Sequence, residues 1–255
     1  MGNAVFLLHG WLSDINDFAC LLPFLENHYK HIERITYPGH GPGEDYREFS
    51  SLLTIELVEK TFEKLSHEYD SIDVIGYSMG GALAAYLASN FEVRKLILLA
   101  PANKYINFRL PFSKIKNLIK IMYALQKAII KKDSQNKEVL KQRIKHILQD
   151  DFISLRYARD KYLKSNFRHA FRNFRELIRY VNEKTIEIKC PSFIAWGRLD
   201  QVIPLGSVKF LYDLCTNEQK ILKKYDDLSH LLLLSPNCDE LVQDIEKFLV
   251  EGGNS

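Results

Sequence analysis

Short apolar runs alternate with helical patterns over most of the chain, and this alternation predicts the order of strands and helices. The apolar runs are rich in Val, Ile, Leu and aromatic residues, as strands covered on both faces usually are. They lie at residues 4–8, 32–37, 71–77, 93–100, 192–197 and 219–225. Helical patterns occupy residues 16–29, 50–68, 79–90, 205–216 and 238–250. Strands that alternate with helices predict an α/β fold with a mostly parallel, doubly wound sheet and right-handed crossovers.

One segment, residues 103–184, breaks the alternation. Its apolar residues recur at helical spacing with lysines between them, and the stretch 152–181 pairs Tyr, Phe and Leu with Arg and Lys. The clearest apolar stripe consists of Ile115, Leu118, Ile119, Met122 and Leu125. These patterns are typical of amphipathic helices. We therefore predict a core of residues 1–102 and 185–255, with a helical cap at 103–184 inserted over the carboxyl edge of the sheet.

Charge separates the same segment from the rest of the chain. The 255 residues are 46% hydrophobic and 26% charged with a net charge of +3, within the range of ordinary globular proteins. Residues 103–184 hold 21 Lys and Arg against 7 Asp and Glu, whereas the remainder holds 14 against 25. A basic cap on an acidic core could attract an anionic membrane surface, in weak contact, or an anionic substrate, or could simply be a solvated lysine-rich face.

Several classes of site and partner lack their motifs. The four cysteines, Cys20, Cys190, Cys215 and Cys238, show no CxxC or Cys/His spacing, so we expect reduced thiols and no metal site. Neither a GxxxxGK[ST] loop nor GxGxxG is present, and we expect no cofactor and no nucleic-acid partner. No apolar run reaches the ~18 residues that cross a bilayer, and the first residues resemble a strand more than a signal peptide. The expected compartment is the cytoplasm.

The most specific motif is Gly76-Tyr77-Ser78-Met79-Gly80-Gly81, which fits GxSxG. It follows an apolar strand and opens a helix, and this context holds a nucleophilic serine on a tight, strained turn. Glycine is needed two positions to either side of Ser78, because larger side chains would collide there. The N-terminus of the following helix would point its N–H groups at a developing oxyanion.

A serine hydroxyl needs a base and an acid that orients the base. Asp200 follows the strand at 192–197, and His230 follows the strand at 219–225. Because carboxyl ends of parallel strands meet at one edge of a sheet, both residues are expected beside Ser78. The order Ser, Asp, His, with each residue after a strand, is the order of GxSxG hydrolases.

A third loop, His9-Gly10-Trp11, ends the first strand. It could aim a backbone N–H across the sheet edge, so we expect the N–H groups of Trp11 and Met79 to form an oxyanion hole. His9 is interpreted as a loop-bracing residue rather than a base. His40, in a turn-rich loop, is expected to order that loop.

Together these motifs resemble those of the α/β-hydrolase superfamily. The resemblance rests on His-Gly-Trp, Pro-Gly-His-Gly, Gly-Tyr-Ser-Met-Gly-Gly, Gly-Arg-Leu-Asp-Gln-Val-Ile-Pro and Leu-Ser-His, and covers residues 3–102 and 190–250. It is similar to the bacterial carboxylesterase and monoacylglycerol-lipase branch. It implies that Ser78 is the nucleophile, Asp200 the acid and His230 the base. The sequence departs from the family pattern in opening on the His-Gly strand, without a leading antiparallel hairpin, and in its long basic insert.

The resemblance and the three residues lead us to expect a serine hydrolase that cleaves carboxylic esters through an acyl-enzyme on Ser78. Its small-molecule substrates would be short- to medium-chain acyl esters or monoacylglycerol-like lipids. The alternatives on the same residues are a thioesterase, a carbon–carbon hydrolase or lyase, and a peptidase. A non-catalytic ligand-binding member of the superfamily is the alternative from another class. The apolar cap residues, with Phe167, Phe171 and Phe174, could line an acyl pocket or only pack the cap.

Overall fold

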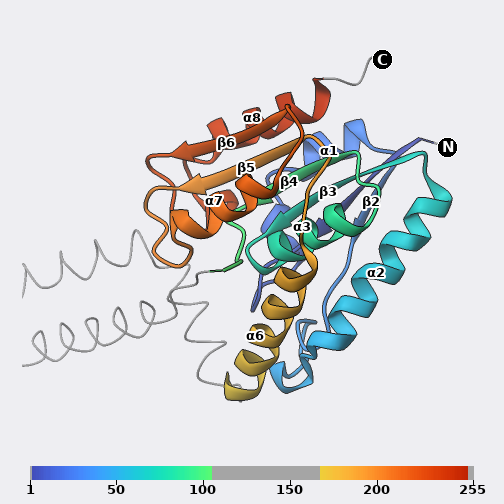
Figure 1. The fold of residues 1–255 in the computed structure, drawn as a ribbon, viewed down its shortest axis with the longest axis vertical. Helices are drawn as coiled ribbons and strands as arrows, with labels where there is room; N and C mark the ends of the chain where they lie inside the picture. Colours follow the sequence, from blue (N-terminus) through green and yellow to red (C-terminus); the bar gives the residue numbers. More distant parts are fainter. Residues whose placement is uncertain (1, 105–166, 252–255) are drawn as a thin grey trace, which may run out of the picture. The chain divides into compact units, whose positions relative to one another are not determined.

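The computed structural model describes residues 2–104 and 167–251, which belong to one compact unit. Within it, six strands form a single sheet in the order β2-β1-β3-β4-β5-β6 (Figure 1). The strands are β1 (Asn3–Leu8), β2 (His31–Arg34), β3 (Ser71–Tyr77), β4 (Lys95–Leu99), β5 (Ser192–Gly197) and β6 (Lys220–Tyr225). Every neighbouring pair is parallel. The predicted α/β fold with a parallel, doubly wound sheet is therefore confirmed.

Helices cover both faces of this sheet (Figure 1). The α-helices are α1 (Leu22–His28), α2 (Ser51–Glu68), α3 (Met79–Asn90), α6 (Phe167–Lys184), α7 (Leu205–Leu214) and α8 (Asp239–Val250). Short 3-10 helices are η1 (Ile15–Phe18), η2 (Tyr46–Glu48) and η3 (Leu232–Leu234). Helix α3 packs on β1, β3 and β4, and in turn supports α2 and α6.

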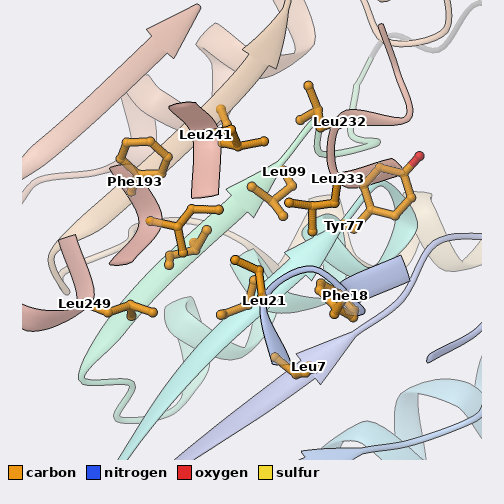
Figure 2. Close-up of a cluster of buried hydrophobic side chains, with 14 of the residues drawn as sticks. Leu7, Phe18, Leu21, Tyr77, Leu99, Phe193, Leu232, Leu233, Leu241 and Leu249 are labelled. Atoms are coloured by element: carbon orange, nitrogen blue, oxygen red, sulfur yellow. The ribbon is translucent and has the colours of Figure 1, made fainter. Parts of the chain in front are cut away.

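Alternate side chains of the strands face opposite layers, because successive residues of a strand point to opposite sides. Figure 2 shows the cluster on one face, where Leu7, Tyr77, Leu99 and Phe193 of the sheet meet residues of the surrounding helices. The helical residues include Phe18, Leu232, Leu233, Leu241 and Leu249, and Leu21, the N-cap of α1, joins them. On the other face, the small buried residues of α3, Ala82, Ala84 and Ala85, let that helix approach the sheet closely. A core on each face fixes the strand ends that carry the site.

The strand order reverses at β1, because β2 lies on one side of β1 and β3 lies on the other. In open parallel sheets, ligands bind outside the carboxyl ends of the strands at such a reversal. Leu8 pairs in register with Gly76, so the segments that follow β1 and β3 leave the sheet side by side. The carboxyl ends of these two strands therefore define the place of the site.

Several predicted boundaries were wrong, among them the end of the helix predicted at 205–216, which stops at Leu214, and the start of the strand predicted at 93–100, which begins at Lys95. Three differences have a visible structural cause. The strand predicted at 32–37 ends at Arg34, because its partner β1 ends at Leu8 and pairing reaches only Leu7 with Arg34. The strand predicted at 93–100 ends at Leu99, because Ala100 takes a left-handed φ of 43°. The helix predicted at 16–29 divides into η1 and α1, and α1 carries a proline in its first turn, where the missing N–H costs nothing.

The predicted cap at 103–184 remains a prediction, because most of it lies outside the described residues. Ile115, Leu118, Ile119, Met122 and Leu125 are all outside them, as is the first part of the stretch 152–181. Its last part forms α6, which packs on α2 and α3. Among the helices of residues 2–104 and 167–251, none combines the length and the apolar character needed to span a membrane.

Candidate active site

Ser78 occupies the tight turn between β3 and α3. Its backbone has a φ of 52° and a ψ of −114°, a conformation that costs an L-residue free energy and persists only where the surroundings hold it. The Ser78 N–H donates to the Leu99 carbonyl at 2.9 Å, and the Ser78 carbonyl accepts from the N–H of Ala102 at 2.8 Å. The end of β4 and the residues after it therefore hold the backbone of the turn on one side. Ser78 is 9% exposed.

Glycine is required at two positions around Ser78, as the sequence predicts. A Cβ at Gly76 would overlap the Gly80 carbonyl, and a Cβ at Gly80 would overlap the Leu8 carbonyl at the end of β1. Both neighbours are backbone atoms and cannot swing aside as a flexible side chain would. The two glycines thus allow α3 to begin directly against β1 and β3.

Asp200 lies in the loop after β5 with its carboxylate fully buried. One carboxylate oxygen, Oδ1, accepts the N–H groups of Val202 and Ile203, both at 2.8 Å. The other oxygen, Oδ2, lies 2.9 Å from Nδ1 of His230. Local backbone bonds therefore fix the rotation of the carboxylate and leave one defined oxygen for the histidine.

His230 links Asp200 to Ser78. Its Nδ1 contacts the carboxylate, and its Nε2 lies 3.1 Å from the Ser78 Oγ. A carboxylate only accepts hydrogen bonds, so Nδ1 carries the proton and the lone pair of neutral Nε2 faces the hydroxyl. The structure thus brings the three predicted side chains together, although they are separated by up to 152 positions in the sequence.

Backbone hydrogen bonds join the loops that carry Asp200 and His230. The N–H of Arg198 donates to the Tyr225 carbonyl at 2.8 Å, and the N–H of Leu199 donates to the Leu228 carbonyl at 3.0 Å. Gly197 lies so close to Leu228 that a Cβ would overlap its carbonyl. The loops after β5 and β6 therefore extend the pairing of the two strands beyond their ends.

The loop that carries Trp11 lies against the nucleophile turn. The carbonyls of Leu8 and His9 lie against Gly80 in the first turn of α3. Gly10 packs on the Tyr77 ring so closely that a Cβ on Gly10 would lie 3.1 Å from a ring carbon. Met79 is the first residue of α3, where N–H groups have no partner within the helix and the helix dipole is positive. This packing places the backbones of the predicted donors, Trp11 and Met79, on neighbouring segments of one edge.

Buried polar side chains brace this loop. Asp17 accepts the N–H of Gly10 at 3.2 Å and the hydroxyl of Ser13. The Nε2 of His40 accepts a hydrogen bond from the N–H of Leu12 at 3.1 Å. Leu12 itself has a left-handed φ of 57°. His9 takes the bracing role expected of it, since its Nδ1 donates to the Gly10 carbonyl at 2.8 Å.

Sequence reasoning missed Asp17 and assigned His40 only to its own loop. In the sequence, Asp17 is only an acidic residue seven positions after Gly10, and this spacing alone does not predict that the two residues are in contact. Tyr37, beneath the loop, donates its hydroxyl to the His9 carbonyl at 3.2 Å. Burial, together with the nearby Asp17 carboxylate, holds the pKa of Tyr37 well above its ordinary value, so this hydroxyl stays a donor.

Helix α6 covers the side chain of Trp11. The Phe174 ring stacks on Trp11 at a centroid distance of 4.6 Å, and the Phe171 ring lies 6.1 Å away. Asn173, on the same helix, accepts the N–H of Ser51 at 3.2 Å and so ties α6 to the start of α2. Two of the aromatic residues that could line an acyl pocket or only pack the cap, Phe171 and Phe174, thus pack on Trp11.

A parallel sheet in this strand order, with a serine on a strand-to-helix turn and an acid and a histidine after the last two strands, defines the α/β-hydrolase class of serine hydrolases. Over residues 2–237 the chain matches the family described as serine aminopeptidase, S33, and it belongs to that family. The resemblance noted from its motifs is therefore confirmed.

Three comparisons place the chain among characterised proteins. The carboxylesterase of Bacillus subtilis (strain 168) is 23% identical over 253 residues, covering 97% of this chain and 92% of that protein. The enol-lactonase from Burkholderia xenovorans LB400 matches with a TM-score of 0.65 at 14% identity, covering 98% and 92%. The monoacylglycerol lipase of Paleococcus ferrophilus matches with a TM-score of 0.62 at 15% identity, covering 96% and 93%. At these identities the two structures share the fold.

Proposed function

We propose that this hydrolase cleaves carboxylic esters through an acyl-enzyme on Ser78. The observation that carries the proposal is the position of His230, between Asp200 at 2.9 Å and the Ser78 hydroxyl at 3.1 Å. These are the distances at which a base accepts the proton of a nucleophile and is oriented by an acid. The proposed substrates are short- to medium-chain acyl esters or monoacylglycerol-like lipids.

In the first half of the reaction, Ser78 Oγ attacks the ester carbonyl while its proton passes to Nε2 of His230. Asp200 stabilises the imidazolium that forms, because its carboxylate accepts from Nδ1. The carbonyl oxygen becomes an oxyanion, which the N–H groups of Trp11 and Met79 stabilise. Removing one such donor typically costs ~2.7–4 kcal/mol of transition-state stabilisation. The tetrahedral intermediate then expels the alcohol, which takes its proton from His230.

In the second half, a water molecule gives a proton to His230 and attacks the acyl carbonyl. Collapse of this second intermediate releases the carboxylic acid and returns the proton to Ser78. Only the unprotonated imidazole can take the first proton, so the mechanism requires His230 in its neutral form. None of these steps uses a group other than the protein and water.

One observation favours esters among the reactions that these residues could perform. The carboxylesterase, which is similar over nearly the whole chain, and the two matched structures all carry the names of ester-cleaving enzymes. A thioesterase or a carbon–carbon hydrolase would use the same side chains, and substrate comparison separates them.

The test is a substrate panel measured with wild type and two serine variants. We expect hydrolysis of p-nitrophenyl esters, with lower kcat/KM on acyl-CoA thioesters, on diketone substrates and on aminoacyl p-nitroanilides. Ser78→Ala should lose roughly 10⁶-fold in kcat, since the members of such a triad act as a unit. Ser66→Ala, at an exposed serine on α2, should leave kcat unchanged. Full ester hydrolysis by Ser78→Ala would overturn the proposal.

We also propose that the protein acts in the cytoplasm. All four cysteines are free thiols, and three of them are buried. Free thiols persist in a reducing compartment, whereas secreted proteins tend to pair them.

A further inference from the structure

Asn103 lies beside the nucleophile turn, four residues after the end of β4. The preceding residue, Ala102, donates its N–H to the Ser78 carbonyl at 2.8 Å, and Pro101 packs against Gly81. Covalent bond lengths therefore keep the Asn103 Cα within about 8 Å of the Ser78 carbonyl oxygen. An asparagine at this distance from the proposed nucleophile is close enough for its side chain to meet a bound substrate.

The other neighbour of Asn103 is the helix that follows the acid loop. The Asn103 N–H donates to the Ser207 hydroxyl at 3.3 Å, in the first turn of α7. That helix begins two residues after Ile203, whose N–H is bonded to Asp200. Asn103 is thus held between the nucleophile turn on one side and the acid loop with its helix on the other.

The side chain of Asn103 is buried and makes no hydrogen bond within residues 2–104 and 167–251. The residue is only 1% exposed, and among those described residues neither Oδ1 nor Nδ2 has a partner. An amide can donate through Nδ2 and accept through Oδ1, and burying both unpaired costs stability. A buried, unpaired amide on a residue held beside the turn that carries the proposed nucleophile is therefore a candidate for contact with a ligand.

We propose that Asn103 is a specificity-determining residue that hydrogen-bonds a hydroxyl group of the substrate, close to the scissile ester. A hydroxyl both donates and accepts, so it satisfies Oδ1 and Nδ2 together. A carboxylate would leave Oδ1 unpaired, and an ammonium group would leave Nδ2 unpaired. The inference rests on the proposed ester hydrolysis and narrows its substrate class to hydroxylated esters, with the hydroxyl on either the acyl chain or the alcohol.

Two pairs of esters, each matched in size, distinguish a hydroxyl on the acyl chain from a hydroxyl on the alcohol. For the acyl chain, the pair is p-nitrophenyl 3-hydroxybutyrate and p-nitrophenyl 3-methylbutyrate. For the alcohol, it is 2-hydroxyethyl butyrate and propyl butyrate. In one pair, wild type should favour the hydroxylated ester, and Asn103→Leu should lower that preference roughly ten- to a hundredfold, mainly by slowing the hydroxylated member.

Stability supplies a second readout that does not depend on turnover. Leucine is similar in volume and needs no hydrogen bonds, so Asn103→Leu should raise the Tm. Thr54→Val is the matched control, because the Thr54 hydroxyl is also buried and unpaired but lies on α2, which supplies no catalytic side chain. It should raise the Tm and leave both ester preferences unchanged. If leucine prevents folding, Asn103→Ala, which keeps the backbone bond to Ser207, should give the same loss of preference.

Two outcomes would overturn the inference, and they are distinguishable. If wild type and Asn103→Leu hydrolyse all four esters with the same ratios in both pairs, Asn103 binds no substrate hydroxyl and its amide serves an internal water. If wild type hydrolyses none of the four, the proposed ester hydrolysis fails and the inference falls with it.

Discussion

At the scale of single residues, Asp200 decides which nitrogen of His230 carries the proton. Two backbone N–H groups hold its Oδ1, so only Oδ2 faces the imidazole. Because that oxygen accepts only, the proton stays on Nδ1 and the basic lone pair points at Ser78. The orientation of the proposed base thus depends on a carboxylate that is itself oriented by its own loop.

This dependence makes Asp200→Asn an informative variant. The N–H groups of Val202 and Ile203 will select the amide oxygen, which turns the amide NH₂ toward His230. The imidazole must then place its proton on Nε2, where it cannot act as a base toward Ser78. We expect kcat to fall roughly 10⁴-fold with little change in Tm. Asp226→Asn, at an exposed partner of Arg198, is the control and should keep full activity. Normal turnover by Asp200→Asn would contradict the assigned role.

The three main site residues could be predicted from the sequence because each follows a strand of the alternating pattern. In a parallel sheet this position alone brings Ser78, Asp200 and His230 to one edge. The contribution of Asp17 could not be predicted, since its contact with Gly10 arises from the packing of η1 on the end of β1. Asn103 was missed for the same reason, because its burial without partners is visible only in the folded chain.

At the scale of elements, α6 supports the loop that carries a proposed oxyanion donor. Helix α6 contacts that loop through the Phe174 ring, which stacks on Trp11. Phe174 is buried, with only 2% of its surface exposed. A second aromatic pair, Phe62 and Phe91, joins α2 to the end of α3 at a ring distance of 5.3 Å. Since Phe91 is the C-cap of α3, this pair lies at the end of the helix opposite Ser78.

These two pairs give a matched test of the role of α6. Phe174→Leu and Phe62→Leu each remove one aromatic contact and should each cost about 1 kcal/mol in the free energy of unfolding. Only Phe174→Leu should also lower kcat, by roughly tenfold, because a small displacement of the Trp11 N–H weakens oxyanion binding. Urea unfolding and steady-state kinetics measure the two effects. Equal losses of kcat in both variants would show that α6 does not position this loop.

Element types were predictable where burial dominates, and element ends were not. Apolar runs covered on both faces marked the four central strands β1, β3, β4 and β5, whereas the edge strands β2 and β6 are only partly buried. The glycine motif marked the start of α3. The ends depend on neighbours, since the pairing of β2 with β1 reaches only Arg34 and Leu7, and β4 ends where the left-handed Ala100 leads to Ala102, whose N–H donates to the Ser78 carbonyl. Such limits are set by contacts between distant segments rather than by local pattern.

At the scale of the whole molecule, the core holds thiols that resist ionisation. Burial raises the pKa of Cys190 from its ordinary value of 9.0 to about 12. In the unfolded chain the thiol would ionise near the ordinary value. Folding therefore keeps the proton on Cys190 between about pH 9 and 12, and the stability that this group contributes is present below pH 9 and lost as the pH rises through that range.

We therefore expect the free energy of unfolding to fall between pH 8 and pH 10, partly through Cys190. Cys190→Ala should reduce that fall by about 1 kcal/mol, because the group that ionises in the unfolded chain is removed. Urea unfolding of both proteins at the two pH values provides the measurement, with each protein serving as its own reference at pH 8. An identical fall in both proteins would show that Cys190 does not contribute.

The whole sheet brings Ser78 and His230 to one edge, and the central claim is that Ser78 is a nucleophile activated by His230. The most direct test is covalent labelling with a fluorophosphonate, followed by mass spectrometry of the digested protein. We expect one adduct, on Ser78, with no label in Ser78→Ala and much slower labelling in His230→Ala. Failure of the folded wild-type protein to label, or an adduct on another residue that persists in Ser78→Ala, would contradict the claim.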